Sequence, residues 1–376
     1  MKFIKALSVF AGTIIGVGIF GLPYVASKAG FFTVLLYFIV MSFIAIVIHL
    51  LFGKVVLGTE RLYRLPGFVG EYLGPNWKKI TLLTIGAGLM GALLAYLIIG
   101  GTFLEFFFSP YFGGNNLIYT LLFFGTGAYL IFRDIKRISQ VEFSLLLVFF
   151  AILVIFFVRT IPFINFSNFQ RIDLAFVTLP YGVILFALWG SALIPEAEEI
   201  LGEDAKKLLK WVIVSGILLA AITYLFFVFV VFGASGANTS KDAISGLANT
   251  IGGGIIRLGF LFGVITCFTS FITLGLTLKK MFWYDFGLPP KLSWFIACFT
   301  PLALLFLGLR EFIAVIGLTG AVALGFEAII IIFLYRAFLK KNPPAGGSQK
   351  MNSLLYILPI FFILGIFFEI YYFFAR

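Results

Sequence analysis

Two clusters of glycine and proline interrupt apolar stretches of the chain at matching places. The first cluster spans Gly12–Pro23 and the second spans Pro180–Pro195. In each cluster a glycine, Gly18 or Gly190, precedes the last proline by five positions. Both residue types destabilise a helix, so each cluster predicts a break that frees backbone N–H and C=O groups.

Peptide groups freed in such breaks have the chemistry to bind a zwitterion. An unpaired peptide group in hydrocarbon costs several kcal/mol, so a break persists where it lines a cavity or binds something. Amides at the start of a half-helix suit a carboxylate, and freed carbonyls suit an ammonium group or a cation. The paired clusters therefore predict a site for an amino acid. The alternative is that the glycines only let helices pack closely.

The composition places these breaks in a membrane. Of 376 residues, 62% are hydrophobic and 11% are charged, and the mean hydropathy is +1.13. A soluble domain is about half apolar and a quarter charged. The excess excludes a soluble enzyme, a nucleic-acid-binding module and a disordered chain, and predicts an all-α polytopic membrane protein. Both cysteines lie in apolar stretches, so neither a disulfide framework nor a metal-ligand spacing is indicated.

Eleven apolar stretches are expected to span the bilayer, at about 20 residues for each span. They are residues 8–29, 31–52, 80–104, 116–132, 141–159, 175–195, 209–232, 254–278, 292–308, 311–335 and 353–373. Most of the 27 lysines and arginines fall in the connections on the side of the N-terminus. The positive-inside rule then predicts a cytoplasmic N-terminus and an outside C-terminus, in the cytoplasmic membrane. The opening MKFIKALSVFAGTIIG has no A-x-A cleavage site, so we expect a retained first helix.

The spacing of the breaks predicts an internal repeat. Spans one to five cover about 8–159, and spans six to ten cover about 175–335. Because five is odd, the second set would enter the membrane from the opposite side, which is an inverted topology. We therefore expect a ten-helix core over 1–341, a linker at 342–352 and an eleventh helix within 353–376.

Three segments of the chain resemble a known family of membrane proteins. GTIIGVGIFGLPYVASKAGF (Gly12–Phe31) resembles the opening of the amino acid/auxin permeases and of the related bacterial aromatic amino acid permeases. These belong to the amino acid–polyamine–organocation superfamily. GVILFALWGSALIPE (Gly182–Glu196) and TSFITLGLTLKKMFWYDFGLPP (Thr269–Pro290) resemble the sixth and eighth helices of that family. The resemblance implies the LeuT-like fold of five-plus-five inverted repeats, with one extra C-terminal helix.

The same resemblance implies roles for residues at both breaks. Amides of the unwound part of helix one, with one threonine hydroxyl, would meet the substrate carboxylate. Carbonyls of helix six would meet the substrate ammonium, and its aromatic side chains would line or gate the pocket. The residues at the matching positions are Thr13, Gly16, Val17, Gly18, Phe186, Ala187 and Trp189. For Trp189 the alternative is packing against lipid or the core.

A sodium site is also implied by the resemblance, between helix one and helix eight. The matching residues are Gly12, Ile15, Thr266, Thr269 and Ser270. The three hydroxyls are spaced to share one helix face, and hard oxygen ligands suit an alkali cation. The alternative is that these hydroxyls bond back to carbonyls of their own helix. Some proton-coupled relatives carry a lysine in helix five, and this chain has none there, which favours sodium.

Ionisable residues within spans are candidates for function, because charge is costly in the bilayer. Glu327 is expected to lie buried against helix one or six as a proton or ion partner, the alternative being a carboxyl without a coupling role. His49, near the inner end of span two, is expected to be interfacial rather than a proton switch. Glu196, Glu198 and Glu199 are expected to form a solvated face near Lys206 and Lys207.

These features predict a secondary active transporter that moves neutral amino acids by alternating access. No acidic residue is evident beside either break, which disfavours arginine or lysine as the substrate, and aromatic or branched side chains are the neutral ones expected. Na⁺ or H⁺ would drive the cycle, no cofactor other than a coupling Na⁺ is expected, and the partners are a small molecule and the bilayer. The alternative function is a membrane sensor, or a partner subunit, that binds amino acids without net transport. With one histidine and scattered acids, the chain does not suggest an enzyme.

Overall fold

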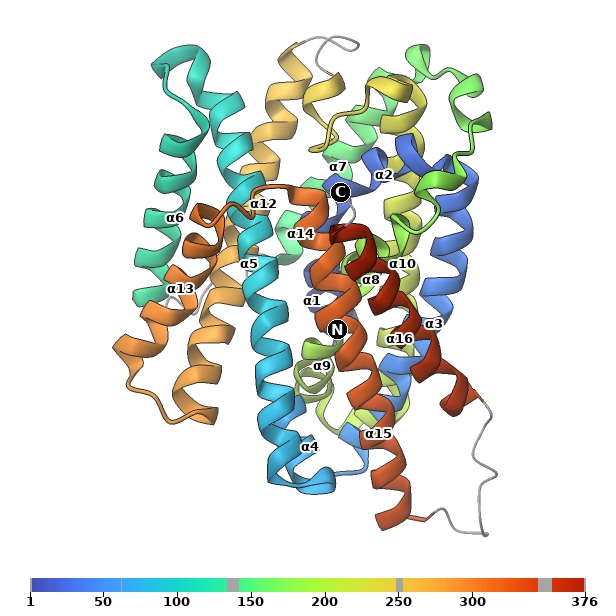
Figure 1. The fold of residues 1–376 in the computed structure, drawn as a ribbon, viewed down its shortest axis with the longest axis vertical. Coiled ribbons are helices and arrows are strands. Elements are labelled where there is room, and N and C mark those ends of the chain that lie inside the picture. The colour runs from blue at the N-terminus through green and yellow to red at the C-terminus, as the bar shows by residue number, and fades with distance from the viewer. Residues whose placement is uncertain (1, 62, 134–141, 248–252, 344–353, 375–376) are drawn as a thin grey trace.

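The computed structural model describes residues 2–61, 63–133, 142–247, 253–343 and 354–374, and the chain has the architecture of an integral membrane protein. These residues form a bundle of helices (Figure 1), and within them there is no β-strand. The long helices run roughly along one axis of the molecule, as the predicted all-α membrane class requires.

Helices lie over each of the eleven predicted stretches. The unbroken helices are α3 (Phe31–Leu57), α5 (Pro75–Phe112), α6 (Asn116–Phe132), α7 (Glu142–Thr160), α10 (Ala205–Ser235), α12 (Gly253–Lys280), α13 (Pro290–Phe306) and α16 (Leu354–Phe374). Three helices are interrupted. Helix one consists of α1 (Lys2–Ile14), η1 (Val17–Gly21) and α2 (Leu22–Ala29), and helix six consists of α8 (Pro180–Leu188), η6 (Ser191–Leu193) and α9 (Ile194–Leu201). The third consists of α14 (Phe312–Leu318), the π-helix η11 (Thr319–Leu324) and α15 (Gly325–Lys341). A short helix, α4 (Leu65–Leu73), connects α3 and α5.

Six helical stretches of the described chain are long and apolar enough to cross a membrane, or seven when the bent first helix is counted as one span. Three further apolar helices, at residues 116–132, 147–163 and 290–306, are shorter. The count of eleven spans and the inverted topology therefore stay predictions. Most of the expected linker at 342–352 lies outside the described residues, and α16 follows it as the eleventh helix.

The helices pack so that the two breaks lie inside the bundle. α10 packs against α1, α2 and α3, while α8 packs among α3, α14 and η11. α5 runs along α12 and α6, and α16 lies against α15 (Figure 1). Gly182 and Gly320 bring α8 and η11 together, since a Cβ on Gly320 would lie 2.8 Å from the Phe186 nitrogen. Close helix packing, the alternative for glycines of the two clusters, thus applies to Gly182.

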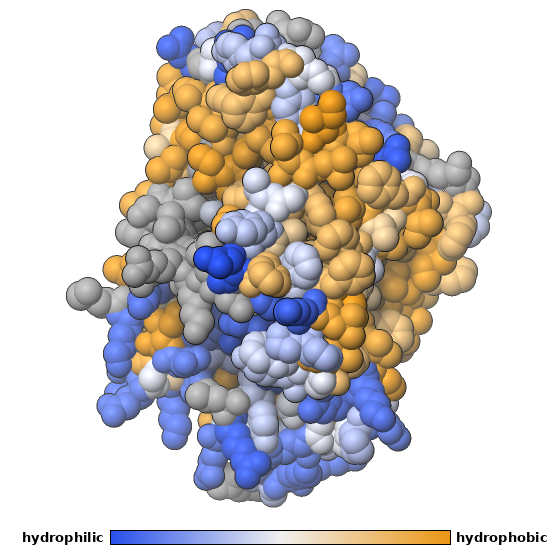
Figure 2. All heavy atoms as spheres, turned by 90° about the vertical axis from the view of Figure 1, so that its left-hand side faces the viewer, coloured by the Kyte–Doolittle hydropathy of each residue, from blue (hydrophilic) through white to orange (hydrophobic). Residues whose placement is uncertain are grey.

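The surface shows how the molecule meets lipid. A broad band of hydrophobic side chains covers the face seen in Figure 2, and hydrophilic residues gather mainly at its lower end. That end carries α4 and the C-terminal end of α15 in Figure 1. Basic residues of α15, Lys340 and Lys341, lie in its last turn. An apolar band of this kind fits a protein that spans a membrane, and the orientation of the chain in that membrane stays a prediction.

Candidate functional site

The first break lies where the glycine cluster predicts it. α1 ends at Ile14, η1 begins at Val17, and the two halves are bent by 42°. Gly16 precedes η1 in an extended conformation, which places Val17 and Gly18 in the first turn after the break. The Thr13 hydroxyl donates to the Val9 carbonyl at 3.0 Å, so in this structure it bonds within its own helix.

The second break lies at the predicted place in helix six. α8 ends at Leu188, and Trp189 is extended with φ −86° and ψ 129°. Gly190 follows, and the chain resumes a helical path at Ser191 and then in α9. Phe186 and Ala187 occupy the last turn of α8, so their carbonyls lie at the C-terminal end of a half-helix.

The two breaks are in direct contact. A Cβ on Gly18 would lie 3.0 Å from the Cα of Ala187 and 3.4 Å from a ring carbon of Phe186. A Cβ on Gly190 would lie 2.7 Å from the Ile14 side chain. The structure therefore brings the seven predicted substrate-binding residues into one region, although their contact with substrate remains a proposal.

A tyrosine from α10 bridges the freed carbonyls of both breaks. The Tyr224 hydroxyl lies 2.5 Å from the Ile14 carbonyl oxygen and 3.1 Å from that of Ala187. Its side chain is fully buried. A phenol has one hydrogen to donate, so it satisfies these two half-helix ends only in part. The Ile14 carbonyl also accepts from the Gly16 N–H at 2.7 Å, so spare acceptor capacity lies mainly at Ala187, where an ammonium group would donate or a cation would bind.

A second tyrosine reaches the amide side of break one from α5. The Val17 N–H donates to the Tyr96 hydroxyl oxygen over 3.4 Å, which is long for a hydrogen bond. Ser270 on α12 is a neighbour of the same hydroxyl. An amide held this weakly is available to a stronger acceptor such as a carboxylate.

His49 holds the amide of break two, and the prediction that it is interfacial was wrong. α3 continues to Leu57, so His49 lies well inside the helix, and its side chain is fully buried against the Phe10 and Trp189 rings. The Gly190 N–H donates to Nε2 over 2.9 Å, and Nδ1 lies 2.7 Å from the Ala45 carbonyl oxygen. The imidazole thus joins α3 to the point where helix six is interrupted.

Glu327 was expected to lie against helix one or helix six, and it lies against helix six. Its Oε1 accepts a hydrogen bond of 3.0 Å from the Trp189 indole and a second bond from the Ser191 hydroxyl. The carboxyl is buried, and it stands one turn after the π-helix η11 ends. The Trp189 ring also packs edge-on against His49, with centroids 4.9 Å apart. The indole therefore packs inside the bundle in this conformation.

The predicted sodium ligands stay untested. The Thr269 hydroxyl donates to the Thr266 carbonyl over 3.1 Å, which is the alternative of bonding within the helix. The Thr266 hydroxyl is buried and has no hydrogen-bond partner in the part of the chain that the structure describes. A Cβ on Gly12 would meet no atom of the described residues within 4 Å, whereas Ile15 is buried.

The described residues contain no cluster of the side chains that usually bind metal ions. Among the described residues, no group of three or more His, Cys, Asp or Glu side chains is placed to hold a metal ion. A cation at the predicted site would have to be held by hydroxyls and peptide carbonyls. Those are the ligands that an alkali ion accepts.

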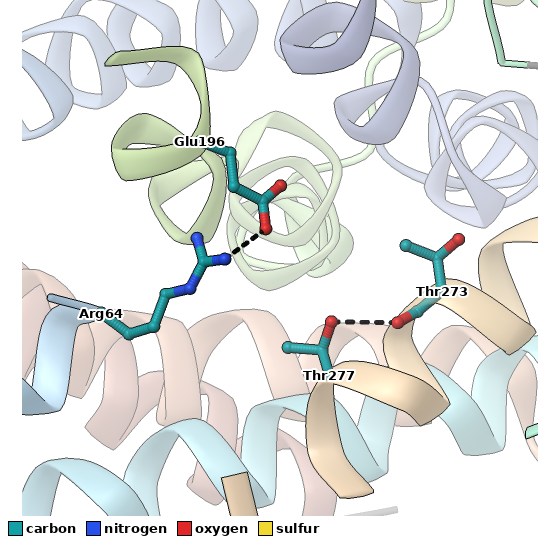
Figure 3. Close-up of polar contacts among 4 residues, drawn as sticks. All are labelled: Arg64, Glu196, Thr273 and Thr277. Carbon is teal, nitrogen blue, oxygen red and sulfur yellow. Dashed lines mark hydrogen bonds and ion pairs between the residues drawn. The ribbon is translucent and has the colours of Figure 1, made fainter. Parts of the chain in front are cut away.

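An ion pair joins two elements near the basic end of the molecule. The Arg64 guanidinium, just before α4, lies 2.9 Å from the Glu196 carboxylate on α9 (Figure 3). Glu196 is partly exposed and its partner is Arg64, not a lysine of the following helix; an oxygen of Glu198 is buried, so the expected solvated face is formed only in part. Figure 3 also shows Thr277, whose hydroxyl donates to the Thr273 carbonyl over 2.9 Å on α12.

Sequence reasoning missed Tyr96 and Tyr224. A signal for both exists, because each is a tyrosine in the middle of an apolar span. A buried phenol almost always needs a hydrogen-bond partner, and freed peptide groups are the nearest supply of such partners in a membrane helix. Which tyrosine reaches which break is not encoded in the spacing.

Comparison with known proteins agrees with this geometry. The model of the tryptophan/tyrosine permease family matches residues 1–369. The chain belongs to the tryptophan/tyrosine permease family. This permease is a transporter and not an enzyme. Of the two families that the sequence resembles, the family found corresponds to the aromatic amino acid permeases. No curated protein matches it in sequence.

Solved structures share the fold of this permease at low sequence identity. MhsT in complex with L-phenylalanine is 16% identical, with a TM-score of 0.69 over 97% of this chain and 98% of that one. MHP1, a nucleobase-cation-symport-1 family transporter with bromovinylhydantoin bound, is 13% identical, with a TM-score of 0.66 over 98% and 91%. The manganese transporter of Eremococcus coleocola is 12% identical, with a TM-score of 0.61 over 97% and 87%. The likeness extends over nearly the whole of each chain, so the permease has the LeuT-like transporter fold.

Proposed function

We propose that this permease is a symporter that carries neutral aromatic L-amino acids across the cytoplasmic membrane by alternating access. The observation that carries the proposal is the contact between the two breaks. The half-helix amide at Val17 and the half-helix carbonyls at Ile14 and Ala187 lie beside one another. The amide suits a carboxylate and the carbonyls suit an ammonium group, which are the two charged groups of an amino acid.

An aromatic side chain is supported by two further observations. The matching family is named for tryptophan and tyrosine. Phe186, in the last turn of α8, and Trp189, in the second break, are partly exposed inside an otherwise buried segment. Aromatic rings gain from packing against one another beyond the area that they bury. A branched apolar side chain would be a weaker substrate of the same site.

The coupling ion is Na⁺ or H⁺, and each has a candidate group. The Thr266 hydroxyl has no hydrogen-bond partner among the described residues, and with Thr269, Ser270, Gly12 and Ile15 it would serve sodium. The Glu327 carboxyl, bonded to helix six, would serve a proton. Either ion would link the breaks to the driving gradient, with the N-terminus in the cytoplasm and the C-terminus outside.

Flux through reconstituted protein tests the proposal. Proteoliposomes would be given labelled tryptophan, tyrosine, phenylalanine or leucine under an imposed Na⁺ gradient, an imposed H⁺ gradient or neither. We expect saturable uptake of the three aromatic amino acids that exceeds protein-free liposomes and needs one of the gradients. Binding of these amino acids with no flux under any gradient would instead support the sensor or partner subunit.

A further inference from the structure

His49 is placed to control the direction of one peptide group at the second break. Its Nδ1 lies 2.7 Å from the Ala45 carbonyl oxygen, which only accepts, so Nδ1 carries a hydrogen. The Gly190 N–H donates to Nε2 over 2.9 Å, so Nε2 carries a lone pair. Both contacts are satisfied by one neutral tautomer.

The peptide that His49 binds is the one that joins Trp189 to Gly190. In a trans peptide the C=O and the N–H point in opposite directions, and the unit is planar. An acceptor that fixes the Gly190 N–H toward α3 therefore turns the Trp189 carbonyl away from α3. Trp189 is the first residue past α8 and is extended, so no helical geometry orients this peptide.

The imidazole itself is held firmly enough to do this. It is fully buried, with the Phe10 ring edge-on at 6.2 Å and the Trp189 ring edge-on at 4.9 Å. Glu327 on α15 also accepts from two side chains of this segment, Ser191 and Trp189. Hydrogen bonds from α3 and from α15 therefore hold residues 189–191, where the second half of helix six begins.

We propose that His49 is a positioning residue that aims the Trp189 carbonyl at the ammonium group of the substrate. The inference rests on the proposed function, since it assigns the orientation of one acceptor in that site. A carbonyl turned the wrong way would leave the ammonium short of one acceptor. Hydrogen bonds to charged groups contribute about 1.5–3 kcal/mol, which corresponds to a loss of about tenfold or more in affinity.

Two substitutions at this position separate the hydrogen bond from the bulk of the ring. His49→Gln carries an amide oxygen near the place of Nε2 and can still accept from Gly190. His49→Phe keeps an aromatic ring against Phe10 and Trp189 but accepts nothing. If the His49→Phe protein does not fold, His49→Asn makes the same comparison, because its amide is too short to reach Gly190.

The experiment measures binding of L-tryptophan and of indole-3-propionate, which lacks the ammonium group, to purified protein. We expect His49→Phe to bind L-tryptophan about tenfold more weakly, with His49→Gln within about threefold of the unchanged protein. Indole-3-propionate should bind all three proteins alike, or none of them. Equal affinity of His49→Phe and the unchanged protein for L-tryptophan would overturn the inference. So would an equal loss of L-tryptophan affinity in His49→Phe and His49→Gln, or an equal loss of affinity for L-tryptophan and indole-3-propionate in His49→Phe. If the unchanged protein binds no aromatic amino acid, the proposed function fails instead.

Discussion

The Trp189 indole donates a 3.0 Å hydrogen bond to Oε1 of Glu327, a residue 138 positions later in the chain. This bond joins the interrupted helix six to α15, which follows a second irregular segment, the π-helix η11. A carboxyl in a membrane bundle is retained where it meets such donors, because an unpaired one would be too costly. The bond ties the Glu327 carboxyl directly to the candidate site.

Replacing Glu327 with Gln tests its role in coupling. The amide keeps an oxygen that can accept from Trp189 and Ser191, but it removes the charge and the titrating proton. If Glu327 carries the coupling proton, uptake driven by a pH gradient should fall by about tenfold or more, while exchange of labelled for unlabelled substrate continues. Uptake would also lose its dependence on pH.

The control for this change is Glu105→Gln. Glu105 lies near the end of α5 and accepts a hydrogen bond from Asn116, away from both breaks. It should transport as the unchanged protein does. Uptake by Glu327→Gln that matches the unchanged protein at every pH would remove Glu327 from the coupling mechanism.

Removing one hydroxyl by Tyr224→Phe should destabilise the permease. The change leaves the buried carbonyls of Ile14 and Ala187 without their shared donor, at a cost of about 1–3 kcal/mol. The thermal unfolding midpoint in detergent should drop, whereas Tyr129→Phe on the exposed surface of α6 should leave it in place. Equal midpoints for the two variants would mean that the bridge does not hold the breaks together.

A single methyl group at Gly182 should disturb the fold more than the same methyl elsewhere. A Cβ on Gly182 would lie 2.9 Å from the Cα of Gly317, where backbone meets backbone and neither can yield. Overpacking of this kind costs about 1–3 kcal/mol. Gly125→Ala is the matched control, because its Cβ would meet no atom within 4 Å in the part of the chain that the structure describes. There alanine should be neutral or slightly stabilising, since it favours helix, and comparison of the two unfolding midpoints is the measurement.

Sodium coupling makes a specific prediction for Thr266→Val. Valine keeps the shape of threonine and deletes the buried hydroxyl that has no hydrogen-bond partner among the described residues. If that hydroxyl binds sodium, the Na⁺ concentration for half-maximal uptake should rise by about tenfold, with choline replacing sodium at constant ionic strength. Thr277→Val, which removes an exposed hydroxyl bonded within α12, should leave it unchanged. Uptake by the unchanged protein that ignores sodium would refute this site.

Much of the site was predictable because helix breaks are local events. Gly16 and Gly190 lie at the interruptions because glycine is a poor helix former, whatever surrounds it. Glu327 stood out for a similar reason, as a carboxyl inside an apolar span. His49 was misjudged because its place in the chain suggested the end of a helix, whereas α3 continues for eight more residues.

The sequence by itself determined that the chain belongs in a membrane and that two of its helices are interrupted. Both follow from composition and from the backbone preferences of glycine and proline, which act within a few residues. Only the tertiary structure decided which side chains meet the freed peptide groups. Tyr96, Tyr224, His49 and Glu327 reach the breaks from four helices far apart in the chain. Their meeting depends on how those helices pack and rotate against one another, and spacing along a single helix does not encode this.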